Sequence, residues 1–182
     1  MQSPRQSHDN ALNQVLRYLK GTVGNSLMFK KGGKQRLVGY SDSSHNTDED
    51  DGKSTSGHIF FYGDTPVTWC SQKQQTVALS SCEAEFMAAT EAAKQAIWLQ
   101  DLLSEITGKE EGRTTVYVDN KSAISLAKNP EQIEVEFVRG EDQCADILTK
   151  ALAKLKFNDM KKKIGVQDSF RSNMKLRREN VG

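Results

Sequence analysis

The chain has 182 residues, with 25 basic and 24 acidic side chains and 36% hydrophobic residues, which is typical of a soluble globular domain with a core of its own. No apolar run approaches the roughly 18 residues that a membrane span needs, so we expect no membrane contact. The first residues form no apolar signal segment, and three scattered cysteines suit neither a disulfide framework nor a zinc site. We therefore expect a reducing compartment, the cytoplasm or else the nucleus.

The net charge of +1 hides three differently charged segments. Residues 1–36 carry seven basic and one acidic side chain, residues 37–150 carry nine basic and twenty acidic ones, and residues 151–182 carry nine basic and three acidic ones. One interpretation is a pair of solvated basic ends. The other is that the basic ends hold a polyanion while the acidic middle binds metal.

Residues 1–33 predict a small segment that precedes the main domain. Apolar residues recur at every third or fourth position of residues 7–20, which predicts an amphipathic helix. A strand is expected at residues 26–31, and two glycines then form a hinge or turn.

Three strands with short connections come next and predict an antiparallel meander. They are expected at residues 37–42, 57–62 and 66–72. A long helix follows at about 81–107, where Ser80 and Glu83 have the spacing of a capping box and Gly108 is a typical C-terminal glycine. Alanines along this helix give it a small face that suits close packing on a sheet.

The last third of the domain alternates strands and helices. We expect a strand at 114–118, a helix at 121–128, a strand at 133–138 and a helix at 142–154 that continues towards residue 164. The connection at 119–132 is long enough for a parallel crossover. This order predicts an α/β domain over residues 34–166, a mixed five-stranded sheet with helices on both faces, followed by a basic and flexible tail at 167–182.

Four acidic residues stand at the ends or starts of these elements. Asp42 ends the first strand of the meander, Asp119 ends the fourth strand, Glu85 lies in the first turns of the long helix, and Asp146 lies near the start of the last helix. Because neighbouring strands bring their carboxyl ends to one edge, Asp42 and Asp119 should lie side by side. Two carboxylates that close repel each other, and a pair of Mg²⁺ ions would relieve the repulsion.

Each acid also has a purely structural explanation, as a turn residue or as a favourable charge near a helix N-terminus. Glu83 and Glu85 compete for the place at the sheet edge, because two positions apart on a helix they face differently. We assign Glu83 to the capping box, which leaves Glu85 for the sheet edge.

The acids belong to a longer series of motifs. In order, these are residues 15–22 (VLRYLKGT), 37–42 (LVGYSD), 52–57 (GKSTSG), 77–85 (VALSSCEAE), 96–99 (AIWL), 118–124 (VDNKSAI), 127–130 (AKNP) and 145–152 (ADILTKAL). From about residue 4 to 166, the series resembles the ribonuclease H region of copia-type LTR retrotransposon Pol polyproteins, with the end of the reverse transcriptase before it.

The resemblance implies a ribonuclease H-like fold and a nuclease that cuts the RNA strand of an RNA–DNA hybrid with two Mg²⁺ or Mn²⁺ ions. It implies that Asp42 bridges both ions and that Glu85 holds one of them near the RNA 2′-hydroxyl. Asp119 would hold the ion that activates water, and Asp146 would complete that site.

The same resemblance suggests a set of polar residues near this edge that contact phosphate or ribose. They are Lys53, Ser54, Gln74, Ser80, Ser81 and Asn120. Roles as turn and cap residues are the alternative for the whole set.

The chain departs from the family after residue 130. The family has a basic, aromatic helix before the fifth strand, whereas here residues 131 and 132 lead directly into that strand, so this helix is expected to be deleted. Its loss should expose an apolar patch on the long helix and the last strands, which invites self-association.

We expect the chain to be a fragment of an element, and two functions are open. One is an active ribonuclease H, and the other is a weak or inactive domesticated fragment that binds nucleic acid or protein in a regulatory or effector-like role.

Overall fold

The chain divides into two units in a computed structural model that describes residues 3–29, 34–48, 50–110, 112–126 and 132–168. One unit combines Met1–Met28 with Val166–Gly182, and the other is Phe29–Gly165. The sequence placed the boundaries at residues 33 and 166 instead. The difference at the C-terminal side arises because the end of the described chain pairs with a strand near its beginning.

The smaller unit consists of one helix and a two-stranded sheet. Helix α1 (Gln6–Thr22) is followed by β1 (Asn25–Leu27), which pairs antiparallel with β7 (Val166–Asp168). Residues 167 and 168, expected in a flexible tail, are therefore part of a strand, and residues 169–182 lie outside the described residues. The strand expected at 26–31 is shorter and starts earlier, and its last two residues also lie outside them.

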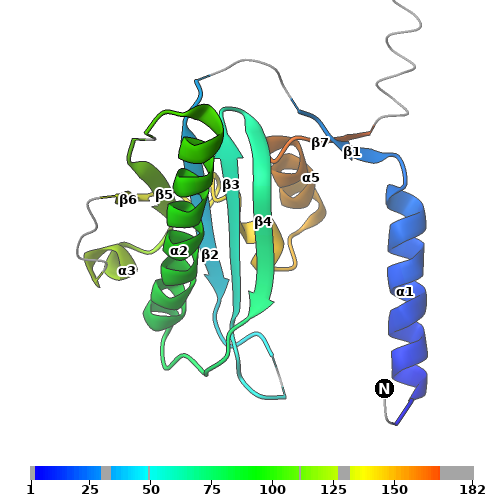
Figure 1. The fold of residues 1–182 in the computed structure, drawn as a ribbon. Coiled ribbons are helices and arrows are strands. Elements are labelled where there is room, and N and C mark those ends of the chain that lie inside the picture. The colour runs from blue at the N-terminus through cyan, green and yellow to red at the C-terminus, as the bar shows by residue number, and fades with distance from the viewer. Residues whose placement is uncertain (1–2, 30–33, 49, 111, 127–131, 169–182) are drawn as a thin grey trace, which may run out of the picture. The chain divides into compact units, whose positions relative to one another are not determined.

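The larger unit is built on a mixed five-stranded sheet (Figure 1). Its strands are β2 (Leu37–Ser44), β3 (Thr55–Tyr62), β4 (Thr65–Lys73), β5 (Thr114–Val118) and β6 (Ile133–Phe137). The spatial order is β4-β3-β2-β5-β6, with β4, β3 and β2 antiparallel and β2, β5 and β6 parallel. This confirms the predicted α/β class and the mixed sheet.

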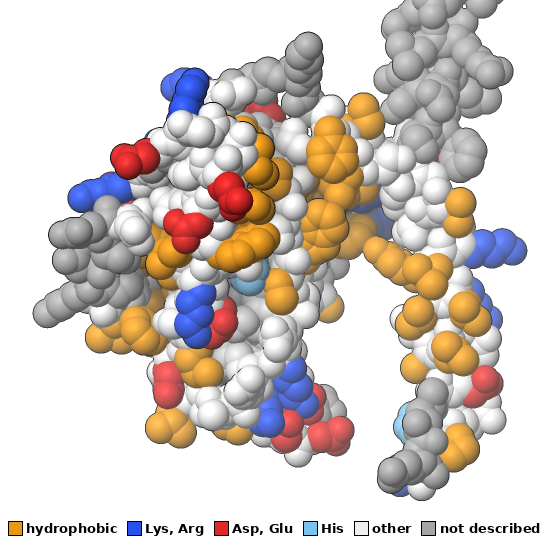
Figure 2. All heavy atoms as spheres, in the orientation of Figure 1, with side chains coloured by type: hydrophobic (Ala, Val, Ile, Leu, Met, Phe, Trp, Pro, Cys, Tyr) orange, Lys and Arg blue, Asp and Glu red, His pale blue; other side chains and the backbone are white. Residues whose placement is uncertain are grey.

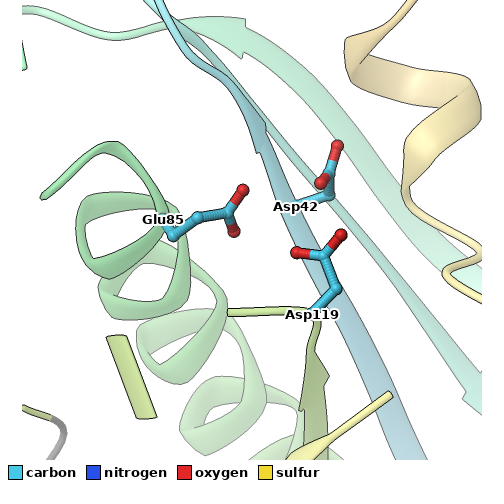
Figure 3. Close-up of side chains that lie close together, drawn as sticks. All are labelled: Asp42, Glu85 and Asp119. Atoms are coloured by element: carbon cyan, nitrogen blue, oxygen red, sulfur yellow. The ribbon is translucent and has the colours of Figure 1, made fainter. Parts of the chain in front are cut away.

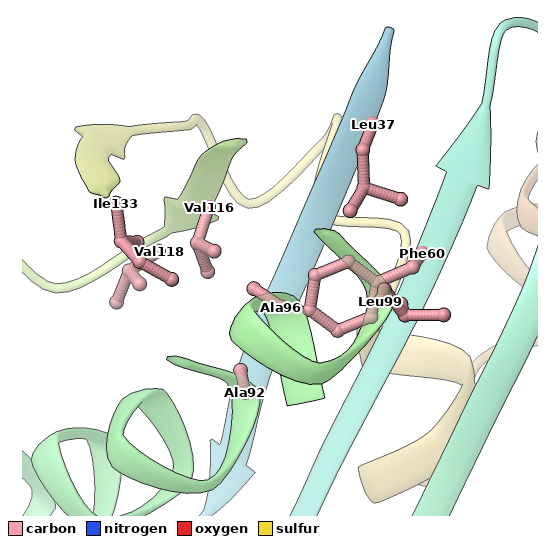
Figure 4. Close-up of a cluster of buried hydrophobic side chains, with 8 residues drawn as sticks. All are labelled: Leu37, Phe60, Ala92, Ala96, Leu99, Val116, Val118 and Ile133. Atoms are coloured by element: carbon pink, nitrogen blue, oxygen red, sulfur yellow. The ribbon is translucent and has the colours of Figure 1, made fainter. Parts of the chain in front are cut away.

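Helix α2 (Ser81–Thr107) covers one face of the sheet because its packed side is made of small residues. Its buried alanines lie at positions 84, 88, 92 and 96, close to helical spacing, and let the helix approach the strands. Phe60 and Leu99 fill the space between them, with valines and isoleucine from β5 and β6 around the same core (Figure 4). The sheet and α2 together form the larger of the two buried clusters.

The opposite face carries α4 (Asp146–Thr149) and α5 (Lys154–Lys163), so helices lie on both faces as predicted. Ile59 and Phe61 of β3 pack there against Ala145 and its neighbours. The prediction of one continuous helix from residue 142 was wrong. The buried amide of Gln143 donates to the carbonyl of Ser41 and its oxygen accepts from the N–H of Ala145, which holds the segment before α4 in a turn.

Helix α3 (Lys121–Leu126) connects β5 to β6. Only residues 127–132 separate it from β6, which leaves no room for an additional helix of several turns, although residues 127–131 themselves lie outside the described residues. The end of the helix expected at residue 128 falls in the same stretch. Within the described part of the chain, no helix is both long and apolar enough to cross a membrane.

Candidate metal and active site

Two parallel strands bring Asp42 and Asp119 to the same edge of the sheet. In the register of β2 and β5, Ser41 lies opposite Val118, the last residue of β5. Asp119 directly follows β5, whereas Asp42 lies within β2, which continues to Ser44 instead of ending at Asp42 as predicted. Asp42 is fully buried, whereas Asp119 is partly exposed. Figure 3 shows the side chains of Asp42 and Asp119 next to one another at this edge.

Glu85 reaches the same place from the first turns of α2. The backbone N–H of Ser43 donates to Glu85 Oε1 at 3.0 Å, which aims the carboxylate at Asp42. Three carboxylate oxygens, one each from Asp42, Glu85 and Asp119, lie within 4.8 Å of one another. Glu85 Oε2 is buried and has no hydrogen-bond partner among the described residues.

Burial and mutual repulsion raise the pKa values of these carboxyl groups. Burial raises the pKa of Asp42 to about 6, against the opposing effect of the nearby Lys150 ammonium. Burial, followed by the charges of Asp42 and Asp119, raises the pKa of Glu85 to about 8. Burial also raises the pKa of Asp119. The cluster therefore favours a proton or a cation at neutral pH.

Asp146 lies beside this cluster and is joined to it through a lysine. Lys150 Nζ lies 2.8 Å from Asp42 Oδ1 and 2.9 Å from Asp146 Oδ1. The second oxygen of Asp146 accepts from Lys156, and the second oxygen of Asp42 accepts from the hydroxyl of Thr149. The structure therefore assembles three of the four predicted acids directly and the fourth through an ammonium bridge.

Gln74 is buried beside the cluster, and its amide group hydrogen-bonds to several neighbours. Its Nε2 donates to Ser56 Oγ at 2.8 Å and to the carbonyl of Ala84 at 3.0 Å, with Ser43 Oγ at 3.5 Å. Because the Ala84 carbonyl can only accept, Oε1 must point the other way, and it has no partner among the described residues. A groove of about 670 Å³ between β4 and α2 has Gln74 in its lining.

The other predicted polar residues have local roles. Ser80 caps α2 by accepting the Glu83 N–H, and Glu83 in turn accepts the N–H of Leu79, so Glu83 belongs to the helix start as predicted. Asn120 Oδ1 accepts two N–H groups at the start of α3. Ser54 Oγ accepts the N–H of Asn46, Lys53 pairs with Asp51, and Ser81 is exposed at the first position of α2.

The residues that hold the acids in place were not among those predicted from the sequence. They are Ser43, Gln143, Thr149, Lys150 and Lys156. The spacing of Asp146 and Lys150, four residues apart at a helix, is a signal for an ion pair that the sequence did contain. The contacts between Asp42 and Thr149 or Lys150, more than a hundred positions apart, leave no such local signal.

Comparisons with solved structures find ribonuclease H domains. The structure is similar to LC11-RNase H1 crystallised with an RNA/DNA hybrid, with a TM-score of 0.45 and 13% identity over 63% of this chain and 94% of that chain. It is also similar to the N-terminal RNase H domain of a Mycobacterium tuberculosis protein, with a TM-score of 0.45 and 14% identity over 71% of this chain and 98% of that one.

Comparisons with curated proteins find retrotransposon polyproteins and one effector. No family model matches the chain. A 96-residue stretch is 47% identical to the secreted RxLR effector protein 161 of Plasmopara viticola, covering 53% of this chain and 68% of that protein.

The longer matches are to Pol polyproteins. The chain is 35% identical over 188 residues to the retrovirus-related Pol polyprotein from transposon RE2 of Arabidopsis thaliana, covering 91% of this chain and 13% of that protein. It is 34% identical over 191 residues to the one from transposon TNT 1-94 of Nicotiana tabacum, covering 93% of this chain and 14% of that protein. The chain thus spans about an eighth of these relatives and belongs to the Pol family of copia-type retrotransposons.

Proposed function

We propose that the chain is a metal-dependent endonuclease that hydrolyses the RNA strand of RNA–DNA hybrids, as part of a retrotransposon reverse transcriptase and ribonuclease H. The observation that carries the proposal is the cluster of Asp42, Glu85 and Asp119, which three separate elements bring within 4.8 Å at one sheet edge. Membership of the Pol family agrees with a nuclease of this type.

The donor set fits a hard divalent cation. All three groups are carboxylates, and Mg²⁺ and Mn²⁺ prefer oxygen ligands. The unpartnered Oε2 of Glu85 is a buried oxygen that such a cation would satisfy. Two bound ions would supply the positive charge that stabilises the attacking and leaving oxygens of phosphodiester hydrolysis. Asp42, Glu85 and Asp119 would hold them, with Asp146 as the fourth ligand.

The residues around the acids orient them before substrate arrives. The N–H of Ser43 fixes Glu85, and the hydroxyl of Thr149 fixes Asp42. Because both contacts are buried and come from the sheet and from α4, the carboxylates keep one arrangement. A preorganised set of charges loses little energy to rearrangement when the phosphodiester binds.

The hybrid would contact the polar set at the same edge. We assign this role to Lys53, Ser54, Gln74, Ser80, Ser81 and Asn120. Gln74 Oε1 is buried and has no partner among the described residues, so it would have to turn towards the groove to accept a ribose 2′-hydroxyl, the group that distinguishes RNA from DNA. The groove between β4 and α2, which includes Lys73 and Lys94, offers a path for one strand.

Cleavage of a hybrid labelled on its RNA strand tests the proposal. With Mg²⁺ or Mn²⁺ the wild-type chain should cut the RNA of the hybrid and leave duplex DNA intact. Asp119→Asn should lower the rate at least about 100-fold, because even the outer partners of metal ligands contribute 10- to 100-fold. Asp101→Asn removes an exposed acid from α2 and should leave the rate unchanged. Equal rates for Asp119→Asn and wild type would contradict the proposal.

A second candidate is a fold that binds nucleic acid or protein without turnover. One observation favours it, namely that Lys150 and Lys156 already neutralise Asp42 and Asp146. The similarity to a protein named as a secreted effector agrees with such a role. Hybrid binding by the wild-type chain without cleavage in either metal, and unchanged in Asp119→Asn, would support this candidate.

A further inference from the structure

Lys150 joins two of the four acids at the sheet edge. Its Nζ lies 2.8 Å from Asp42 Oδ1 and 2.9 Å from Asp146 Oδ1. The side chains of the two aspartates are 0% and 3% exposed, and Lys150 is the one ion-pair partner of Asp42 among the described residues, whereas Asp146 also pairs with Lys156. The lysine side chain is 38% exposed and lies at the rim of the site.

The backbone around α4 fixes this bridge. The N–H of Lys150 donates to the carbonyl of Asp146 at 3.0 Å, which ends the one-turn helix directly beside the sheet. Thr149 donates to the other oxygen of Asp42, and Lys156 donates to the other oxygen of Asp146. All four oxygens of Asp42 and Asp146 are therefore engaged.

The contacts of Glu85 and Asp119 differ from those of Asp42 and Asp146. Glu85 Oε2 has no partner among the described residues, and no ion pair to Glu85 or Asp119 is found among them. Lysines therefore pair directly with Asp42 and Asp146, whereas Glu85 and Asp119 have no direct ion pair among the described residues. A divalent ion meets less competition from ammonium groups at Glu85 and Asp119 than at Asp146.

We propose that Lys150 is a built-in cation of the carboxylate site, so that one divalent ion binds first at Asp42, Glu85 and Asp119, and a second ion that uses Asp146 must displace the ammonium. The proposal rests on the proposed function to the extent that the carboxylates bind divalent ions. It adds that the chain itself sets the order and the relative affinity of the two ions.

Displacement of the ammonium needs no rearrangement of the fold. Lysine carries its charge on a flexible four-carbon chain, and the side chains of Lys150 and Lys156 are 38% and 39% exposed, so both can turn into solvent. Asp42 and Asp146 remain in place, because backbone contacts of β2 and α4 position them. Lys150 is therefore a positioning residue whose charge competes with the second ion.

Calorimetric titration of the full chain with Mn²⁺, without nucleic acid, tests the proposal. The wild type should bind one ion tightly and a second ion more weakly. Lys150→Gln should tighten the second site at least about tenfold, because a unit charge a few ångströms away acts strongly near a protein surface. The same variant should melt at a lower temperature without ions and regain the wild-type midpoint at saturating Mn²⁺.

Two further variants separate the bridge from general effects. Lys150→Arg keeps the charge and should keep the weak second site, which gives a readout even if Lys150→Gln folds poorly. Lys109→Gln removes one exposed charge just beyond the end of α2 and should leave both affinities unchanged. Equal affinities in wild type and Lys150→Gln, a tight second site in Lys150→Arg, or an equal gain in Lys109→Gln would each overturn the proposal.

The two proposals fail separately. A chain that binds Mn²⁺ with the expected dependence on Lys150 but does not cut hybrid supports the built-in cation and contradicts the nuclease. A chain that cuts hybrid in an Asp119-dependent manner, but whose second-site affinity ignores Lys150, supports the nuclease and contradicts the built-in cation.

Discussion

Burial sets the chemistry of the acidic side chains at the sheet edge. Asp42 and Glu85 are 0% and 6% exposed, and burial is the main reason why their pKa values rise to about 6 and about 8. Such values are costly in a purely structural carboxylate, since each charge lacks the hydration it has in water. A cluster of this kind is typical of a functional site, where a cation offsets the cost.

The raised pKa of Glu85 predicts how metal-free stability depends on pH. A carboxyl whose pKa is higher in the folded state than its ordinary value binds a proton in the folded state that the unfolded state lacks, so stability falls as pH rises towards about 8. We expect the free energy of unfolding to drop by about 1–3 kcal/mol from pH 6 to pH 8.5. Chemical denaturation in the presence of a chelator measures it.

Glu85→Gln is the matched control for this dependence. The amide cannot titrate, so its stability curve should be much flatter over the same pH range and should lie above the wild-type curve at pH 8.5. Parallel curves for the two proteins would show that another group, or general charge repulsion, causes the slope.

The four acidic residues could be predicted from the sequence, but the residues that contact them and hold them in place could not. Asp42 and Asp119 are predicted to lie together because both are expected at strand ends, an argument that needs only strand order, although β2 continues past Asp42 to Ser44. Glu85 was chosen over Glu83 from the capping spacing, which the hydrogen bonds of Ser80 and Glu83 confirm. The bridge through Lys150 could not be predicted, because it depends on how closely one short helix approaches the sheet.

At the scale of elements, Gly57 determines how closely α4 approaches the sheet. It lies opposite Asp42 in the pairing of β2 and β3. A Cβ added at Gly57 would lie 2.6 Å from Thr149 Cγ2, closer than real Cβ atoms come to another heavy atom, and 3.0 Å from Leu148 Cβ, which is a tight contact. The missing side chain therefore lets α4 lie against β3, where Thr149 reaches Asp42.

Gly57→Ala should weaken both the fold and the site. Overpacking of a tight contact costs about 1–3 kcal/mol, so we expect the urea midpoint to fall accordingly. Because α4 carries Asp146 and Lys150, the second Mn²⁺ site should change as well. Gly112→Ala, where an added Cβ meets no atom within 4 Å, should leave both unchanged. A Gly57→Ala protein as stable as wild type would contradict this account of α4.

Helix α2 was the easiest element to predict and α4 with α5 the hardest. The predicted range of α2 is the observed one, because a cap, an alanine face and a C-terminal glycine in the left-handed conformation all agree. The segment from residue 139 onwards is governed instead by the buried side chain of Gln143, whose partner Ser41 is remote in sequence. Local patterns cannot reveal such a contact.

The outer surface of α2 carries apolar side chains that suit association. Trp98 and Ile106 are 57% and 71% exposed, and Leu126 of α3 and Phe137 of β6 are also exposed. Figure 2 shows hydrophobic side chains over part of α2 and the neighbouring strands. The sequence had predicted exposed apolar area here from the short link between α3 and β6.

Sedimentation velocity tests whether this surface drives self-association. We expect the wild-type chain to sediment faster as its concentration rises, and a Trp98→Gln, Ile106→Gln double variant to remain closer to monomer, since burial of large apolar side chains is the expected driving force. Association that is equally strong in the variant, or a wild type that stays monomeric throughout, would show that the surface of α2 is not an interface.

For the whole molecule, one comparison concerns the length of the chain against that of its family. The alignment with the RE2 polyprotein extends over 188 positions, more than the 182 residues of this chain, so that relative has residues in this stretch that this chain lacks. The deletion of a helix after residue 130 stays a prediction. The five strands keep their mixed sheet without it.

The acidic and basic segments of the sequence correspond to different parts of the structure. The acidic middle segment contains the whole five-stranded sheet and the cluster of Asp42, Glu85 and Asp119, while all five lysines of the C-terminal segment that the structure describes lie on α5. A polyanion would be repelled by the bare cluster and attracted by the lysines. Binding of a hybrid should therefore depend on divalent ions as well as on ionic strength.

The location of Mn²⁺ in crystals of the full chain tests the central claim, that the sheet edge is a metal site, most directly. Anomalous diffraction should show a peak within coordination distance of the carboxylates of Asp42, Glu85 and Asp119, with Lys150 still bridging Asp42 and Asp146 at low ion concentration. Mn²⁺ found only at other acidic positions, or no peak at saturating concentration, would contradict the account.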